Sequence, residues 1–278
     1  MLVKDWLKET TSTLKGAGIT SARLDAELLL AHVLERSREW LAAHDNDELS
    51  DNQLAAANKQ CTQRAEHTPL AYILGSKEFY NRQFIVDENV LIPRPESEAI
   101  IELLKKSSEG INTVIDIGTG SGCLAISAKL ELGDIHVTAT DISKKALYVA
   151  RSNAKKLGAT VRFIESDFFK SLPRIPTTRP YVIIANLPYV PDDLVTSEEI
   201  RREPSLALFS GADGLDHYRH FWHQVSKLKN KPTRIITESL ASQHTAMTAL
   251  ASQVGFICSE NKDLIQVFPA IGSAPQQA

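Results

Sequence analysis

The stretch NTVIDIGTGSGCLAISAKLEL, residues 112–132, decides the fold class of this chain. It opens with a short apolar run rich in Val and Ile, a pattern that predicts a buried β-strand. Gly118, Gly120 and Gly122 follow, and they allow the backbone to turn tightly and to approach a ligand closely. The apolar residues after them predict a helix. A strand, a tight turn and a helix in this order form the repeating unit of an α/β sheet.

The same alternation continues along the rest of the chain. Further strands are predicted at residues 135–141, 160–167, 181–186, 234–239 and 260–270, and further helices at 96–108, 143–158, 216–228 and 243–255. Strands that alternate with helices predict a parallel, doubly wound sheet. A loop of residues 191–214 follows the strand at 181–186, and a loop of that length in a compact domain is usually functional.

The first part of the chain lacks this alternation and shows helical patterns instead. Leu24, Leu28 and Ala31 recur at the spacing of one helix face, which predicts that they face a core. Ser21 stands just before this pattern, and Ser50 or Asp51 stands at the start of a second one, where the N-caps of helices are expected. The N-terminal region is therefore predicted to be a small bundle of helices.

After this region the helical periodicity gives way to a strand-like pattern. Residues 79–92 alternate in polarity and contain Asn81, a residue that suits the turn of a β-hairpin. The predicted organisation is a helical domain at 1–75, a β-hairpin linker at 76–92 and an α/β domain at 93–278.

Length and composition limit the classes of protein to consider. A chain of 278 residues suits one large domain and one small domain. The formal net charge of -3 gives no overall basic field of the kind that non-specific nucleic-acid binders carry. The three cysteines show no metal-ligand spacing and are expected to be reduced thiols. No apolar run approaches the roughly 18 residues of a membrane span, and the N-terminus resembles no signal sequence. These features predict a cytoplasmic protein with no membrane association and no stable nucleic-acid partner.

Ligands of such sheets lie outside the carboxyl ends of the strands, so the residues at those ends are candidate site residues. Asp141 ends the second strand of the alternation, and its carboxylate can accept hydrogen bonds from both hydroxyls of a ribose. Asp141 or Ser143 can also cap the helix that follows, and the two roles are compatible. Cys123 stands where a dinucleotide fingerprint would place a third glycine. The glycine turn and Asp141 together predict a nucleoside site.

The third and fourth strands end in polar residues as well. Asp167 can accept a hydrogen bond from the exocyclic amine of adenine, and Phe168 can cover the ring, although Asp167 alone is more often a turn residue. Asn186 ends the fourth strand before the stretch LPY, and its amide oxygen can accept from a planar NH2 group. The alternative is a turn in which Asn186 caps backbone groups. The sequence shows no Ser-His-Asp order and no cluster of metal ligands, so no metal is predicted.

Four of these strand ends, DIGTGSG, TATDIS, ESDFF and ANLPY, resemble motifs of class I S-adenosylmethionine-dependent methyltransferases. The stretches RLDAELLLAHVL, PLAYILGSKEFYNRQFIVDENVLIPRPESE and REPSLALFSGADGLDHYR are similar to those of the protein-(glutamine-N5) methyltransferases of peptide-chain release factors, the PrmC/HemK family. The resemblance implies a Rossmann-like, mostly parallel seven-stranded sheet with an antiparallel last strand. It also implies a small N-terminal helical domain that is joined to the sheet domain through a β-hairpin.

The resemblance implies a reaction and its participants too. The enzyme would be a peptide chain release factor N5-glutamine methyltransferase. The cofactor would be S-adenosyl-L-methionine, with S-adenosyl-L-homocysteine as its product. The substrate would be the Gln of the Gly-Gly-Gln motif in class I release factors, whose methylation modulates translation termination. The helical domain would dock the release factor, or its helices would only cover apolar surface and stabilise the fold. We expect a monomer.

Carried over by position, the resemblance assigns roles to the residues at the strand ends. The residues expected to bind the cofactor are Gly118, Thr119, Gly120, Ser121, Gly122, Asp141, Asp167, Phe168 and Asn186. Those expected to hold the glutamine are Asn186, Leu187, Pro188 and Tyr189, and of these Asn186, Pro188 and Tyr189 are expected to be catalytic. The PRPE segment at 93–96 is expected to line the cofactor side.

Two positions depart from the usual pattern of the family, which has Pro at position 187 and Thr at position 97. Leu187 still offers a backbone carbonyl as a second acceptor for the glutamine amide, and Pro188 favours an extended geometry there. Ser97 stands in place of the threonine. The stretch NKDLIQVFPA is shorter than the final hairpin of the family, which leaves the pairing of the last strand open.

Two other functions compete with glutamine methylation. NLPY is also the form that this motif takes in rRNA adenine-N6 dimethyltransferases, so rRNA or DNA adenine methylation is the alternative reaction. Three features argue against adenine methylation: the turn GTGSG, the helical segment at the N-terminus, and the absence of a basic C-terminal RNA domain. A flipped base would also require more positive surface than a net charge of -3 suggests. A non-catalytic binding module would show a damaged cofactor turn or acceptor, whereas Gly118, Asp141 and Asn186 are intact.

Overall fold

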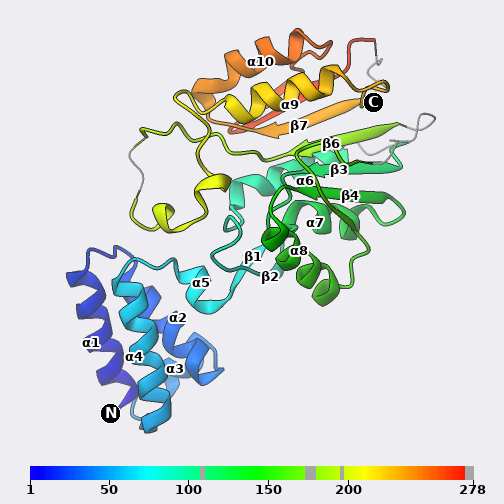
Figure 1. Ribbon diagram of the computed structural model, residues 1–278. Coiled ribbons are helices and arrows are strands. Elements are labelled where there is room, and N and C mark those ends of the chain that lie inside the picture. The colour runs from blue at the N-terminus through cyan, green and yellow to red at the C-terminus, as the bar shows by residue number, and fades with distance from the viewer. Residues whose placement is uncertain (107–109, 173–179, 195–196, 273–278) are drawn as a thin grey trace. The chain divides into compact units, whose positions relative to one another are not determined.

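A computed structural model gives the structure of residues 1–106, 110–172, 180–194 and 197–272 (Figure 1). The described chain forms two compact units. The first unit holds residues 1–76 together with 197–202, and the second holds residues 77–194 and 203–272. A short segment of the long loop therefore belongs to the helical unit, which the sequence did not indicate.

The helices of the first unit are α1 (Val3–Gly16), α2 (Ala22–Leu34), α3 (Arg38–Ala43), α4 (Asp51–Ala65) and α5 (Leu70–Leu74). Their apolar faces enclose a core of their own, which includes Trp6 and Leu30. Ser50 caps α4 as predicted, because its side chain accepts from the N–H of Gln53 while the Gln53 side chain accepts from the N–H of Ser50. Ser21 occupies the N-cap position of α2, but its side chain makes no capping hydrogen bond.

The buried face of α2 differs from the predicted one. Ala31 is buried as predicted, but Leu28 is only half-buried and Leu24 is 42% exposed, so the prediction for Leu24 is wrong. The fully buried residues of the helix include Ala26, Leu29 and Leu30. A run of consecutive leucines makes more than one helix face apolar. Periodicity alone therefore cannot select the face that packs.

A buried ion cluster joins three parts of the helical unit. Arg64 on α4 is 2% exposed, and its Nε donates to Asp25 Oδ2 on α2 at 2.6 Å. One of its terminal nitrogens donates to Glu199 Oε1 at 2.5 Å. Loss of one partner from a buried ion pair typically costs ~3–5 kcal/mol, since the other charge is left uncompensated. The cluster thus anchors residues 197–202 to the helical unit.

The predicted hairpin is present but is shorter than residues 76–92. β1 (Ser76–Phe79) and β2 (Arg82–Ile85) form a two-stranded sheet. Tyr80 and Asn81 between them have φ angles of 50° and 57°, the left-handed values that a two-residue type I′ turn requires. Asn81 therefore lies in the turn, as predicted.

The second unit is built on a seven-stranded sheet with the order β5-β4-β3-β6-β7-β9-β8. Its strands are β3 (Thr113–Ile117), β4 (His136–Asp141), β5 (Arg162–Glu165), β6 (Tyr181–Ala185), β7 (Arg234–Glu238), β8 (Glu260–Lys262) and β9 (Ile265–Pro269). The first five pair in parallel, whereas β9 is antiparallel to β7 and β8 is antiparallel to β9. The mostly parallel fold is confirmed, but the single last strand predicted at 260–270 is a short hairpin.

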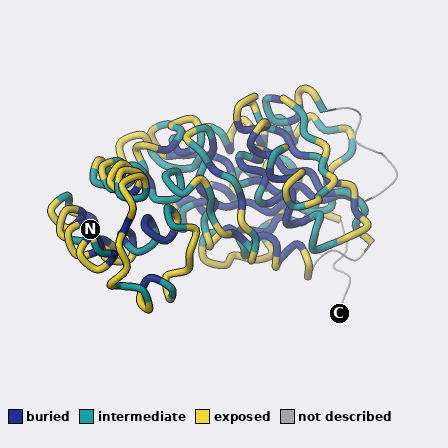
Figure 2. Tube along the Cα trace, turned by 90° about the horizontal axis from the view of Figure 1, so that it is seen from below, coloured by how far each residue is buried: buried dark blue, intermediate teal, exposed yellow. Residues whose placement is uncertain are grey.

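Helices cover both faces of this sheet. α6 (Glu98–Lys106), α7 (Cys123–Leu132) and α8 (Lys144–Leu157) pack on one face, and α9 (Asp216–Ser226) and α10 (His244–Ser252) pack on the other (Figure 1). Val182 and Ile184 of β6 belong to the first core, and Ile183 belongs to the second. Figure 2 shows the buried residues inside this unit and the exposed residues on its outside. Burial on both faces explains why β6 is apolar without interruption.

The strand order reverses beside β3, because β4 lies on one side of it and β6 on the other. A crevice for ligands is expected at the carboxyl ends of the strands at such a point. Short 3-10 helices occur at η1 (Pro95–Ser97), η2 (Ile200–Arg202), η3 (Ser205–Ala207) and η4 (Ala241–Gln243). None of the helices in the described chain combines the length and apolar character needed to cross a membrane.

Candidate active site

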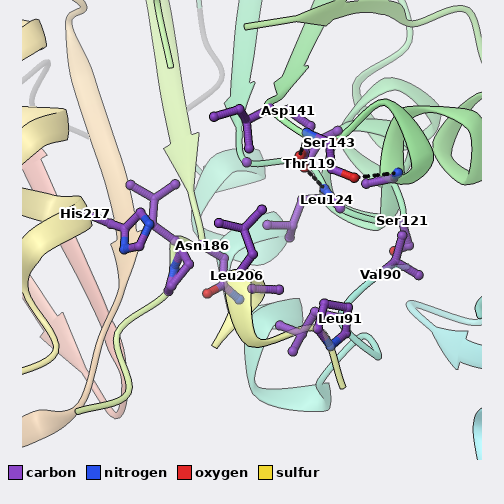
Figure 3. Close-up of a pocket in the computed structure, with 18 of the residues that line it drawn as sticks. Val90, Leu91, Thr119, Ser121, Leu124, Asp141, Ser143, Asn186, Leu206 and His217 are labelled. Atoms are coloured by element: carbon purple, nitrogen blue, oxygen red, sulfur yellow. Dashed lines mark hydrogen bonds between the residues drawn. The ribbon is translucent and has the colours of Figure 1, made fainter. Parts of the chain in front are cut away.

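A cavity of about 420 Å³ opens at the carboxyl ends of β3, β4 and β6 (Figure 3). Most of the residues predicted for the site lie on its wall: Gly118, Thr119, Gly120, Ser121, Asp141, Asp167, Phe168, Asn186, Leu187 and Pro188. Pro93 and Arg94 of the PRPE segment also line it, and the loop of residues 191–214 contributes Leu206. The structure thus brings four strand ends that are far apart in the sequence around one cavity.

The glycine turn is held from behind by the neighbouring strand. The backbone N–H groups of Gly118 and Thr119 both donate to the carbonyl of Thr140 at 2.9 Å. Gly118 has a φ of 74°, and a Cβ atom there would lie 2.9 Å from Leu187 Cδ2. Glycine is therefore required by the backbone conformation and by the close approach of Leu187. The turn after β3 and the stretch after β6 pack directly against each other.

Asp141 ends β4 and holds the middle of the glycine turn. Its Oδ2 accepts from the N–H of Gly120 at 2.9 Å, and its Oδ1 accepts from the N–H of Ser143 at 2.8 Å. Burial raises the pKa of this carboxyl, and the backbone hydrogen bonds oppose the rise. Ser143 caps α8 with its own side chain, which accepts from the N–H of Ala146 at 3.2 Å. The backbone N–H of Ile142 also hydrogen-bonds to this carboxylate, which has about four lone-pair sites and can therefore still accept from a ligand hydroxyl.

The chain after β5 supplies an aromatic wall. Phe168 has a φ of 52°, a left-handed value that is unusual for a bulky residue. Its ring packs against His220 with the ring centroids 5.3 Å apart, and both residues line the cavity. Asp167 pairs with Lys170 Nζ through Oδ2 at 2.5 Å. A flat aromatic face beside a carboxylate is what a purine base would require.

Asn186 and Leu187 follow β6 and differ in what they contact. Asn186 Nδ2 donates to Ser97 Oγ at 2.9 Å, and no donor from the described residues contacts its Oδ1. Leu187 is 2% exposed and belongs to the core on the α9 side of the sheet. Its N–H donates to the hydroxyl of Tyr218 at 3.4 Å. The leucine side chain therefore anchors this stretch, which the sequence reasoning did not foresee.

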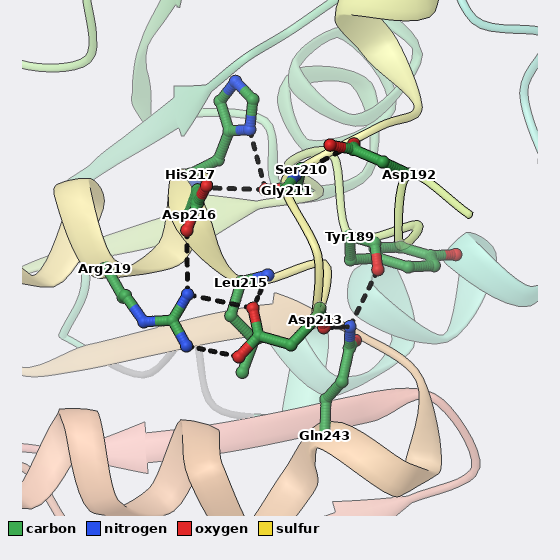
Figure 4. Close-up of polar contacts among 10 residues, drawn as sticks. All are labelled: Tyr189, Asp192, Ser210, Gly211, Asp213, Leu215, Asp216, His217, Arg219 and Gln243. Carbon is green, nitrogen blue, oxygen red and sulfur yellow. Dashed lines mark hydrogen bonds and ion pairs between the residues drawn. The ribbon is translucent and has the colours of Figure 1, made fainter. Parts of the chain in front are cut away.

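Gln243 and the GADGL stretch, residues 211–215, hold the backbone of Tyr189 in place (Figure 4). Gln243 Nε2 donates to the carbonyl of Tyr189 at 2.8 Å and to the carbonyl of Asp213 at 2.9 Å. A Cβ atom on Gly214 would lie 2.2 Å from the Tyr189 carbonyl oxygen, so only glycine allows this approach. Arg219 in turn forms an ion pair with Asp213. The GADGL stretch thus fixes the path of the chain as it leaves β6.

A buried carboxylate, Glu238, ends β7 beside Tyr189. Glu238 is 1% exposed, and it accepts from Ser97 Oγ at 2.6 Å and from the Tyr189 hydroxyl at 2.9 Å. Burial raises the pKa of Glu238, and the hydrogen bonds from the side chains of Ser97, Tyr189 and Asn186 oppose this. The sequence indicated Ser97 only as a departure from the family pattern and gave it no role, and it did not indicate Glu238 at all. Applying the strand-end rule to the fifth strand as well would have found Glu238.

Comparison with known proteins identifies the family. Residues 5–75 match the PrmC N-terminal domain, and residues 96–189 match ribosomal protein L11 methyltransferase (PrmA). A release factor glutamine methyltransferase of Leptospira interrogans is 42% identical over 212 residues, which cover 73% of this chain and 73% of that protein. The one of Bacillus subtilis is 36% identical, and the match covers 77% of each chain. The chain belongs to the release factor glutamine methyltransferase family.

Other relatives are longer than this member of the release factor glutamine methyltransferase family. A bifunctional methyltransferase of Rickettsia felis is 34% identical over 297 residues, which cover 94% of this chain and 56% of that protein. The chain thus spans about half the length of such relatives. Among solved structures, a methyltransferase from Pyrococcus furiosus superimposes with a TM-score of 0.52 at 16% identity, covering 77% of this chain and 98% of that one. This likeness shows a methyltransferase fold.

Two residues predicted for the site of this family lie behind the cavity wall. Gly122 precedes α7, where a Cβ atom would lie 3.0 Å from Ile126 Cδ1 and 3.1 Å from Ala150 Cβ. The glycine therefore lets α7 and α8 pack closely. Tyr189 directs its hydroxyl to Glu238. The ligand contacts expected of Gly122 and Tyr189 stay predictions.

Asp116 on β3 is a second buried carboxylate of this family member. It is 1% exposed and accepts from Thr119 Oγ1 at 2.6 Å. Burial raises its pKa to about 7, helped by the charge of Asp141 and opposed by hydrogen bonds from Thr119 and the backbone of Ala125. Between about pH 4 and pH 7 the folded state therefore holds a proton that the unfolded state releases. The contribution of Asp116 to stability falls as the pH rises through that range.

Asp116→Asn should remove this pH dependence. We expect the free energy of unfolding of the wild type, relative to the variant, to fall by about 3 kcal/mol between about pH 5 and pH 8, because one pKa unit corresponds to ~1.4 kcal/mol. Urea unfolding of both proteins without ligand measures the difference, with Asp134→Asn at an exposed position as the control. A stability difference that stays constant with pH would contradict the assignment.

Proposed function

We propose that this protein transfers a methyl group from S-adenosyl-L-methionine to N5 of the glutamine in the Gly-Gly-Gln motif of class I peptide-chain release factors. S-adenosyl-L-homocysteine is the second product. The proposal is carried by one observation: Asn186 and the residues after it share a cavity with the glycine turn and Asp141. A nucleoside and a planar NH2 group can therefore meet there. Membership of the family supports the choice of substrate.

The residues around the cavity fit this cofactor. Asp141 has lone pairs free for the ribose hydroxyls, and Phe168 with His220 offers a flat face for adenine. No heavy atom of the described residues lies within 4 Å of the place where a Cβ on Gly120 would stand, so this side of the turn is open. Asp116 is buried beneath the turn with a pKa raised to about 7, and a sulfonium cation nearby would favour its ionised form.

When bound, the cofactor supplies an electrophilic methyl group on a sulfonium sulfur. The protein must position the acceptor, because an amide nitrogen is a poor nucleophile whose lone pair is delocalised into its carbonyl. Asn186 Oδ1 and the carbonyl of Leu187 can each accept one N–H of the glutamine NH2 group. Two acceptors fix the nitrogen and stabilise the positive charge that develops on it. Holding reactants in such a pose can supply about 7–11 kcal/mol.

The surroundings of Asn186 suit this positioning role. Leu187 is packed in the core, the Tyr189 carbonyl is held by Gln243, and the Tyr189 hydroxyl is held by Glu238. The backbone from Asn186 to Tyr189 is therefore fixed on several sides before a substrate arrives. No protein base is assigned, because the methylated amide cation is strongly acidic and water can take its proton.

The helical unit is proposed to dock the release factor. Its match to the PrmC N-terminal domain over residues 5–75 and its separate core support a module with its own task. A variant that lacks residues 1–75 should lose affinity for a release factor yet still methylate a short Gly-Gly-Gln peptide. If the helices only stabilise the fold, both activities will fall together.

One experiment tests the proposed reaction against its alternatives. The purified protein is incubated with methyl-labelled S-adenosyl-L-methionine and, separately, with a class I release factor, rRNA and DNA. We expect label on the release factor, and none on a release factor whose motif glutamine is replaced by alanine. Label on rRNA or DNA, with none on the release factor, would establish an adenine methyltransferase instead.

A further inference from the structure

A row of hydrogen bonds connects a buried carboxylate to the proposed catalytic amide. Asn186 Nδ2 donates to Ser97 Oγ at 2.9 Å, and Ser97 Oγ donates to Glu238 Oε2 at 2.6 Å. The three residues come from the end of β6, from η1 and from the end of β7. Ser97 and Glu238 are 2% and 1% exposed, so water has little access to the row.

We propose that Ser97 and Glu238 are positioning residues that set the orientation of the Asn186 amide, so that its oxygen faces the substrate. The role of Asn186 in this inference rests on the proposed function. With Glu238 ionised, the order of the hydrogen bonds follows from the donors and acceptors of the three groups.

That order begins at the carboxylate. An ionised Glu238 can only accept hydrogen bonds, so the single proton of the Ser97 hydroxyl must point to it. Ser97 Oγ is then left with lone pairs only, and its other partner must be a donor. In Asn186 only the NH2 half of the side chain can donate. The amide is therefore held with Nδ2 toward Ser97 and Oδ1 on the opposite side.

The orientation matters because the two halves of an amide have opposite hydrogen-bonding character. An Asn186 side chain turned by 180° would present N–H groups to the NH2 group of a glutamine substrate. Two donors facing each other cannot bond, and one acceptor for the reacting nitrogen would be lost. The two orientations are nearly equal in shape, so packing alone does not select between them. The acceptors on the Nδ2 side, which are Ser97 Oγ and the Glu238 carboxylate, do select.

The same carboxylate also reaches the other end of the motif. Glu238 Oε1 accepts from the Tyr189 hydroxyl at 2.9 Å. One buried group thus fixes the first and last residues of the stretch from Asn186 to Tyr189. This double contact explains why a carboxylate is kept at the end of β7 despite the cost of its burial.

The first test compares Ser97→Ala with Ser97→Thr. We expect kcat to fall about 10- to 100-fold in the alanine variant, with the KM for the release factor and the Kd for S-adenosyl-L-homocysteine changed less than threefold, because misplacement of a positioning group acts on kcat. The threonine variant keeps a hydroxyl and should restore most of the loss. The control is Ser127→Ala on α7, which removes an equally buried hydroxyl that makes no hydrogen bond with the described residues. An alanine variant with kcat within twofold of the wild type would overturn the proposal.

The role of Glu238 is tested with a double-mutant cycle. If Ser97 and Glu238 act through the same row of hydrogen bonds, their effects on kcat should not multiply. The double variant Ser97→Ala, Glu238→Leu should then reduce kcat no more than the stronger of the two single changes. Thermal unfolding checks that each variant is folded. Full multiplication of the two effects would show that Glu238 acts independently of Ser97.

A second measurement needs no activity. With ¹⁵N-labelled asparagine, the side-chain amide signal of Asn186 is identified by its loss in Asn186→Asp. We expect this signal to shift, and its hydrogen exchange to accelerate, in Ser97→Ala but not in Ser127→Ala. An unchanged signal in Ser97→Ala would refute the positioning role. If the wild type methylates no release factor, the proposed function fails, and this measurement still decides the hydrogen-bond order.

Discussion

Asn186→Ala should lower kcat for methylation of a release factor by about 10²–10³-fold, the range found when one preorganised transition-state contact is removed. The side chain reaches the cavity from the end of β6, and its Oδ1 contacts no donor among the described residues. The alanine keeps the backbone but removes one of two acceptors for the glutamine NH2 group. Single-turnover assays with saturating cofactor measure the loss at the chemical step.

The fold should tolerate this change. Ser97 and Glu238 remain paired with each other after Asn186 is removed, so no buried charge loses all of its partners. A suitable control is Asn58→Ala in the helical unit, which removes an amide whose Oδ1 accepts from Trp6 Nε1 at 2.8 Å. We expect the control to lower stability while kcat is kept. Near wild-type turnover by Asn186→Ala would exclude the amide as an acceptor.

The sheet and its ligand cavity could be predicted because both follow from local patterns. Apolar runs such as the one that forms β6 indicate strands, and alternation with helices requires parallel order. Parallel order brings all carboxyl ends to one edge, so Asp141 and Asn186 meet although they lie far apart in the sequence. The positions of these residues on one cavity needed no knowledge of side-chain packing.

The positions of other residues depended on contacts that leave no local pattern. Ser97 and Glu238 are 141 residues apart in the sequence, and no local pattern indicates that they pair with each other. Glu199 lies in a loop with no periodicity, yet its pairing with Arg64 assigns residues 197–202 to the helical unit. The Leu187 side chain could be assigned only once its contact with the glycine turn was seen. Such contacts between distant residues depend on how the whole chain packs, so they cannot be read from the local pattern around either residue.

Asp141→Ala should weaken the binding of S-adenosyl-L-homocysteine by at least about 10²-fold. A hydrogen bond to a charged acceptor contributes ~1.5–3 kcal/mol, and the proposed ribose contact has two of them. The variant also loses the acceptor that holds the N–H of Gly120 at 2.9 Å, so the glycine turn becomes less ordered. Isothermal titration calorimetry with the product avoids any dependence on turnover.

The control for this loss must separate affinity from stability. Ser50→Ala removes the capping box of α4 and should cost about 1 kcal/mol of stability, but Ser50 lies in the helical unit and lines no part of the cavity. Its affinity for S-adenosyl-L-homocysteine should equal that of the wild type. Asp141→Asn should resemble the alanine variant, because an amide places an N–H group opposite the N–H of Gly120 or of Ser143. If Asp141→Ala bound the product as tightly as the wild type, the carboxylate would have only its backbone role, and the ribose site would have to lie elsewhere in the cavity.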